Sequence, residues 1–307
     1  MKDNGLLVQY FNANTPADQT LWAKAAKDAV TLKKIGATAV WFPPATKGAA
    51  GKEDMGYAPY DLYDLGEFNQ KGSVGTRYGT KKEYLEAIDA MKVQGINVYA
   101  DIAVRQKLGA DSVEKVTAAD FNAKDIPQMI GNKKIVGALS KFTFAGRRSK
   151  YSKFKWNWNH FAGIDWQQDD FKKRVCELSG MTEEEAEKKY KLSKYDYIIG
   201  SELDLYNQEV YDELMTWAKW YEDVTGVDGF RFQEAEKVPG WFIRDFAEAA
   251  SNAGEEEKEI FTVGDFWHWR CDYINDYIAS ADNQPSMFDC RCISVSMMHQ
   301  LQKENMI

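Results

Sequence analysis

Residues 81–102 read KKEYLEAIDAMKVQGINVYADI and indicate the fold class. In the first part, Lys81–Gln94, apolar side chains recur at intervals of three and four residues between charged ones, which predicts an amphipathic helix. The second part, Ile96–Ile102, is a short run rich in apolar, β-branched and aromatic residues, which predicts a buried strand. A helix followed at once by a buried strand is the repeating unit of a parallel α/β sheet.

The same alternation continues on both sides of this stretch. Further amphipathic stretches predict helices at Leu21–Ile35, Val210–Val224 and Pro239–Ala253. Further short apolar runs predict strands at Leu6–Phe11, Ala37–Phe42, Val227–Phe232, Ile260–Phe266 and Ser286–Phe288. We therefore expect a parallel sheet of about six strands covered by helices.

One interval breaks this alternation. More than a hundred residues separate the third strand, near Asp101, from the fourth, near Phe230, and a plain crossover needs far fewer. This predicts an inserted subdomain at residues 105–204, between two parts of the main domain at 1–104 and 205–307. Inside the insertion, Thr182–Tyr190 is expected to form a charged helix.

The composition excludes several classes of protein. The chain has 307 residues, of which 44% are hydrophobic and 28% charged, as is typical of a globular protein. The net charge of -8 argues against nucleic-acid binding, which needs a clustered basic face. No apolar stretch approaches the roughly 18 residues of a membrane span. The N-terminus lacks the apolar core of a secretory signal, so we expect a cytoplasmic protein with no membrane partner.

One basic and aromatic run, Lys141–Lys155, allows three interpretations: an RNA-binding segment, a folded loop of a sugar-active protein, or a solvated face. We favour the folded loop over RNA binding, and the solvated face stays open. The cysteines and histidines show no disulfide framework or metal-site spacing, so we expect reduced, mostly packed cysteines. They are Cys176, Cys271, Cys290, Cys292, His160, His268 and His299.

Several motifs agree in order and spacing with one family. Gly56–Phe68 (GYAPYDLYDLGEF) is followed by Tyr78–Lys81 and by the aromatic run Phe154–Phe161 (FKWNWNHF). These motifs, together with the strand sequences at Asn97–Asp101, Gly229–Phe232, Phe261–Trp267 and Ser286–Asp289, resemble the bacterial liquefying and cytoplasmic α-amylases of glycoside hydrolase family 13. The resemblance covers nearly the whole chain. It implies a (β/α)8 TIM barrel, incomplete here at about six strands, with an inserted B-like subdomain after the third strand.

An incomplete barrel raises the question of what covers its edges. Two missing strands would leave two open sheet edges, which favour association with other chains. We therefore expect that another chain supplies the rest, that the sequence is a fragment, or that the sheet stays open. An oligomer or a partner chain over the edges is possible on this basis.

The resemblance implies hydrolysis of α-1,4-glucans with retention, which needs a nucleophilic carboxylate and a proton-donating carboxylic acid about 5–5.5 Å apart. The nucleophile position, two residues after Arg231, holds Gln233, whose neutral amide cannot form the usual ester. Glu234 comes next, but strand alternation predicts that it points away from the barrel mouth. The acid position holds Asp265, one methylene shorter than the Glu of the family, and a misplacement of about 1 Å can cost about a hundredfold.

Other positions also depart from the family. The third carboxylate has no counterpart in the chain, and the family's histidines are replaced at Gln106 and Lys237. The calcium-site positions correspond to Arg105, Asp196, Glu202 and Lys237. Calcium needs oxygen ligands, so we expect no metal and no cofactor. We expect the Arg105 guanidinium to replace the ion and to pair with Asp196 or Glu202, unless it points to solvent.

A sugar could still bind to this site without being hydrolysed. The resemblance assigns Tyr57 to stacking on a glucose ring, Asp101 and Arg231 to the inner site, and Trp267 to added aromatic surface. For Trp156 and Trp158 we favour core packing.

Three functions follow. The first is a catalytically impaired, non-hydrolytic protein that binds α-glucan, a maltooligosaccharide or a protein partner. The second is an active α-amylase with altered catalytic residues, in which Glu234 would be the substitute nucleophile. The third is an assembly module that uses the open barrel edges.

Overall fold

A computed structural model describes residues 5–121, 129–167, 172–177, 200–254, 258–266 and 270–288. For residues 120–121, 129–133, 166–167 and 172–177 it describes the backbone only. The expected helix at Thr182–Tyr190 lies outside the described residues, as do Trp267, Asp196, His268, His299, Cys290 and Cys292.

The main sheet has six parallel strands, and all six strands expected from the apolar runs are confirmed. The strands lie side by side in the same order as in the sequence, as they do in an incomplete barrel. Each strand is shorter than its apolar run, because the run extends into the turn at one end or at both. The strands are β1 (Leu7–Gln9), β2 (Ala39–Phe42), β5 (Asn97–Ile102), β12 (Gly229–Phe232), β13 (Phe261–Gly264) and β14 (Ser286–Met287).

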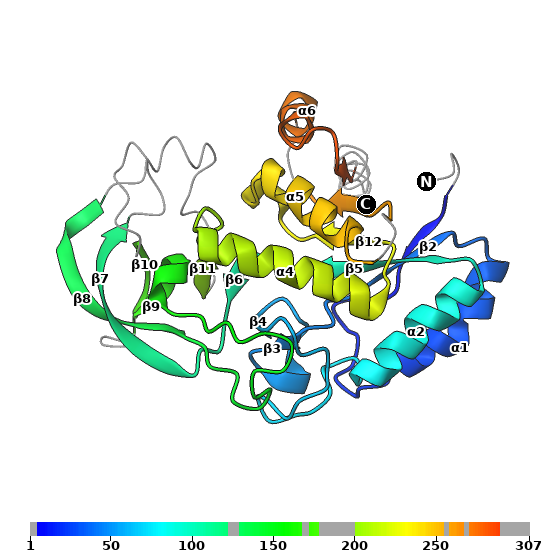
Figure 1. Ribbon diagram of the computed structural model, residues 1–307, viewed down its shortest axis with the longest axis horizontal. Coiled ribbons are helices and arrows are strands. Elements are labelled where there is room, and N and C mark those ends of the chain that lie inside the picture. Colours follow the sequence, from blue (N-terminus) through cyan, green and yellow to red (C-terminus); the bar gives the residue numbers. More distant parts are fainter. Residues whose placement is uncertain are drawn as a thin grey trace, which may run out of the picture.

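Helices pack against this sheet, and the four predicted ones are confirmed. They are α1 (Leu21–Lys34), α2 (Lys81–Val93), α4 (Gln208–Thr225) and α5 (Gly240–Ser251). In Figure 1, α1 and α2 lie side by side at one end of the molecule, and α4 packs along α5. Local sequence determines where two of these helices begin or end. Thr80 and Glu83 form a capping box at the start of α2, and Gly226 ends α4 in the left-handed conformation.

A further helix, α6 (Cys271–Ser280), was not predicted. Its apolar residues Ile274, Tyr277 and Ile278 do recur at helical spacing, but the helix is short and none of its residues is fully buried. Cys271 is exposed on it, which is an exception to the expectation of mostly packed cysteines.

The segment between β5 and β12 forms a second sheet, drawn at the opposite end of Figure 1 from α1 and α2. Its strand pairs are antiparallel, and a long hairpin of two strands dominates it. The strands, in the order β10-β7-β8-β9-β11-β6, are β6 (Gln106–Lys107), β7 (Ser112–Phe121), β8 (Met129–Lys141), β9 (Phe161–Gln167), β10 (Lys172–Glu177) and β11 (Ser201–Leu203).

The smaller elements lie in the connections. They are a short hairpin of β3 (Lys47–Gly48) and β4 (Pro59–Asp61), and the 3-10 turns η1 (Gly51–Glu53), η2 (Trp158–His160) and η3 (Ala235–Lys237).

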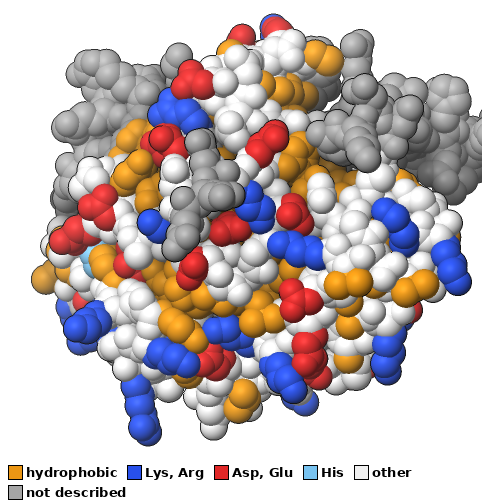
Figure 2. Space-filling model, turned by 45° about the vertical axis from the view of Figure 1, so that its right-hand side comes forward, with side chains coloured by type: hydrophobic (Ala, Val, Ile, Leu, Met, Phe, Trp, Pro, Cys, Tyr) orange, Lys and Arg blue, Asp and Glu red, His pale blue; other side chains and the backbone are white. Residues whose placement is uncertain are grey.

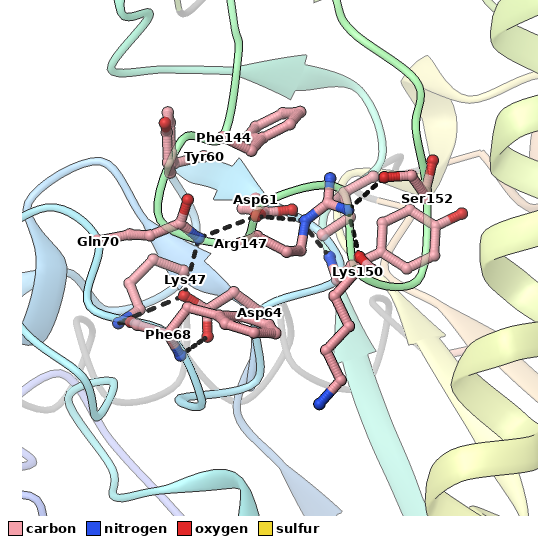
Figure 3. A network of polar contacts seen from close by, with 12 residues as sticks. Lys47, Tyr60, Asp61, Asp64, Phe68, Gln70, Phe144, Arg147, Lys150 and Ser152 are labelled. Carbon is pink, nitrogen blue, oxygen red and sulfur yellow. Dashed lines mark hydrogen bonds and ion pairs between the residues drawn. The ribbon is translucent and has the colours of Figure 1, made fainter.

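A buried ionic network joins the connection after β2 to the basic and aromatic run at 141–155 (Figure 3). The Arg147 Nε donates to Asp61 Oδ2 at 2.8 Å, and the Arg147 Nη1 donates to the carbonyls of Lys150 and Ser152. The amide of Gln70 donates to Asp61 and Asp64. Arg147 is 2% exposed, so at this position the run is a folded loop and the solvated-face interpretation is wrong.

Lys107 is buried beside this network, at the base of the second sheet. Its ammonium lies 5.1–5.4 Å from the ring centroids of Phe142, Phe144 and Trp156. No described residue accepts a hydrogen bond from it. Burial lowers the pKa of Lys107 to about 7, although the charge of Asp61 acts in the opposite direction.

This burial predicts a pH-dependent stability. Between about pH 7 and pH 9 the unfolded chain holds the Lys107 proton and the folded chain has lost it, so the free energy of unfolding should rise with pH by about 1 kcal/mol per unit. In Lys107→Met that contribution is absent. Urea unfolding of both chains across this range tests the difference, and parallel pH profiles would contradict it.

Candidate functional site

Three charged side chains meet at the carboxyl ends of the central strands. Arg231 on β12 pairs in register with Asp101 on β5 and with Val263 on β13. Paired residues of neighbouring parallel strands project to the same face, and Asp265 is two residues beyond Val263. The strand register therefore brings Asp101, Arg231 and Asp265 together.

The Arg231 guanidinium bridges the two carboxylates. Its Nη1 lies 3.0 Å from Asp101 Oδ1 and 3.2 Å from Oδ2, and its Nη2 lies 2.5 Å from Asp265 Oδ2. The Tyr57 hydroxyl donates to Asp101 Oδ2 at 2.5 Å. The Trp41 ring lies against the guanidinium, 4.6 Å from its central carbon. The result is a buried ion-pair cluster with the Trp41 ring on one side.

Burial dominates the electrostatics of this cluster. It raises the pKa of Asp101 to about 6, although Arg231 and the Tyr57 hydroxyl both favour the ionised form. Burial also raises the pKa of Tyr57, and the negative charge of Asp101 adds to the effect. For Arg231 burial acts the other way, but attraction to Asp101 and Asp265 outweighs it and raises the pKa of the guanidinium.

The chain changes direction just after Arg231. Strand β12 ends at Phe232. The backbone nitrogen of Gln233 donates to the Ile102 carbonyl at 3.2 Å. Glu234 follows in the left-handed conformation, with φ 49° and ψ 50°. The alternation argument for Glu234 therefore fails, because the strand has already ended. Its carboxylate instead contacts Lys237 Nζ at 2.7 Å and Arg105 Nη1 at 3.3 Å.

Sequence reasoning missed the role of Trp41 in this region, and it noted Glu236 only as half of the Glu236-Lys237 pair that stands where the family has Lys-His. Trp41 was read only as part of a strand, since nothing in the sequence indicates that its ring meets Arg231. Glu236 is half-buried in η3, where burial raises its pKa and the charge of Asp265 acts in the same direction. Among the two tryptophans expected to pack in the core, Trp156 is buried but Trp158 is 37% exposed, so that expectation is wrong for Trp158.

Comparison with known proteins identifies the scaffold. No protein-family model matches the chain. It is 41% identical over 288 residues to an α-amylase of Geobacillus stearothermophilus, an alignment that covers 93% of this chain and 52% of the relative. It is 35% identical over 295 residues to the cytoplasmic α-amylase of Escherichia coli, with 93% and 58% covered. The chain is a homologue of the α-amylases.

The solved structures agree on the fold. The α-amylase of Geobacillus thermoleovorans, in complex with acarbose, matches with a TM-score of 0.53 at 16% identity, and the match covers 90% of this chain and 50% of that one. An α-amylase of Malbranchea cinnamomea matches with a TM-score of 0.52 at 14% identity, covering 91% and 50%. This α-amylase homologue spans about half the length of the curated relatives it matches.

The surface of the α-amylase homologue carries charges of both signs. On the face drawn in Figure 2, basic and acidic side chains are interspersed rather than gathered by sign. None of the helices in the described segments is long and apolar enough to cross a membrane.

Proposed function

We propose that this α-amylase homologue binds an α-glucan at the carboxyl ends of β5, β12 and β13 without hydrolysing it. The observation that carries the proposal is Gln233, which stands where the family has its nucleophile. An amide cannot form the glycosyl ester through which retaining glycosidases work.

The state of Asp265 supports the same proposal. A general acid must present its proton to the leaving oxygen of the sugar. Here one carboxylate oxygen of Asp265 is engaged by the Arg231 guanidinium at 2.5 Å, and the side chain is 9% exposed. Because the side chain is shorter than Glu and paired with Arg231, this oxygen is held farther from the leaving oxygen of a bound sugar.

The alternative of an active enzyme would need Glu234 as its nucleophile. Glu234 is held between two cations, Arg105 and Lys237, beyond the end of β12. Attack on an anomeric carbon would require it to leave both partners, so the ion pairs oppose this alternative.

Binding does not need these catalytic groups. Tyr57 is only half-buried, and its hydroxyl is fixed by Asp101, so its ring can offer a face to a sugar. The buried Asp101–Arg231 ion pair holds this tyrosine in place. No described group suggests nucleic acid as the ligand. The cytoplasmic location expected from the sequence stays a prediction.

Isothermal titration of the purified chain with maltoheptaose tests the proposal. We expect saturable binding that Tyr57→Ala weakens by about tenfold or more, because loss of a stacking ring costs about 1–2 kcal/mol. The matched control is Tyr273→Ala, which removes an exposed tyrosine of α6 and should bind like the unmodified chain. No heat of binding, or equal binding by the two variants, would exclude Tyr57 and this site as the glucan-binding surface.

A further inference from the structure

A buried cation lies at the junction between the two sheets. Arg105 follows β5 and precedes β6, and its side chain is 6% exposed. Its Nη1 lies 3.3 Å from Oε2 of Glu234, which follows β12 in the main sheet. Its Nε lies 3.9 Å from Oε1 of Glu202, on β11 of the second sheet. The guanidinium therefore stands between one carboxylate from each sheet.

Backbone hydrogen bonds also connect the two sheets next to Arg105. The Leu203 amide nitrogen donates to the Arg105 carbonyl at 2.7 Å. Next to it, Glu202 pairs with Gln106 in the antiparallel ladder of β11 and β6. Both the main chain and the side chain of Arg105 thus attach β11 to the end of β5.

The family resemblance implies a calcium ion at these positions, and the donor set does not fit one. Calcium takes about 6–8 oxygen ligands. Two of the matched positions instead carry cations, Arg105 and Lys237, and the matched Asp196 lies outside the described residues. Lys237 Nζ donates to Glu234 Oε1 at 2.7 Å. Within the described segments, no three His, Cys, Asp or Glu side chains are grouped so that they could hold a metal.

Among the described side chains of this group, the charges balance. Glu202 and Glu234 contribute two negative charges, and Arg105 and Lys237 contribute two positive ones. A divalent cation would have to enter against a fixed guanidinium that cannot lose its proton in a protein. Arginine also presents several donors in a rigid fork, which suits carboxylates arriving from two directions.

We propose that the Arg105 guanidinium replaces a metal ion at this junction, so that attachment of the second sheet to the main sheet is independent of calcium. The proposal does not rest on glucan binding, and its tests measure stability rather than activity.

Thermal unfolding of the full chain in calcium and in excess EDTA is the first test. We expect the same unfolding midpoint in both solutions. Arg105→Met should lower the midpoint by about 5 °C or more, because two partly buried carboxylates lose their shared cation. The control Arg148→Met removes an exposed arginine and should leave the midpoint unchanged. A midpoint of the unmodified chain that falls in EDTA would overturn the proposal, and this comparison holds even where a variant fails to fold.

Hydrogen exchange locates the effect. In Arg105→Met the Leu203 amide should exchange at least about tenfold faster than in the unmodified chain, because local opening at the junction becomes easier. Amides of β2, such as that of Val40, should keep their rates. Unchanged exchange at Leu203 would show that Arg105 does not hold the junction and would overturn the proposal.

Discussion

The purified chain should hydrolyse soluble starch and a chromogenic maltoheptaoside at least about 10⁴-fold more slowly than the Geobacillus stearothermophilus α-amylase, because removal of a catalytic nucleophile costs about this much or more. The reason lies at two positions. Gln233 cannot attack the anomeric carbon, and Asp265 is engaged by Arg231. Release of reducing ends and of the chromophore, with the relative assayed beside the chain, measures the difference.

The control for this experiment is Glu234→Gln. If the chain is inactive for the stated reason, the variant and the unmodified chain give the same background signal, with and without calcium. Turnover that Glu234→Gln abolishes would make Glu234 the nucleophile and the chain an active amylase, against the proposed function. Maltoheptaose binding in the same preparation shows that an inactive sample is correctly folded at the site.

Arg147→Met should lower the free energy of unfolding by about 3–5 kcal/mol, the usual cost of removing one partner of a buried ion pair. Arg147 and Asp61 have side chains that are each 1% exposed. The substitution leaves the Asp61 carboxylate with only the Gln70 amide as a side-chain donor among the contacts in Figure 3. Urea unfolding followed by tryptophan fluorescence measures the change.

Lys150→Met is the matched control, since Lys150 lies in the same loop and pairs with Glu67 at the surface. Solvent screens such a pair, so its loss should leave the urea midpoint unchanged within error. Equal midpoints for Arg147→Met and Lys150→Met would contradict the role given to the buried network.

Local sequence patterns predicted most of the main sheet. Each strand of the main sheet coincides with a short apolar run, and each of the four predicted helices with a recurrence of three and four residues, because these periods reflect which side of an element faces the core. The antiparallel strands of the second sheet were missed. The strands β7 (SVEKVTAADF) and β8 (MIGNKKIVGALSK) mix charged, small and apolar residues without a regular two-residue alternation, so the sequence pattern does not mark them as strands.

For the candidate site, the sequence by itself determined which residue types stand at each matched position: Gln233 and Asp265 where the family has its catalytic carboxylates, and Arg105 where it has a calcium ligand. Only the tertiary structure decided how they are used. Arg105 contacts Glu234 and Glu202, and Arg231 contacts Asp265, because segments distant in the chain meet at the carboxyl ends of the main-sheet strands. Ion pairing depends on distances of a few ångströms between such ends, and no local period of the sequence encodes those distances.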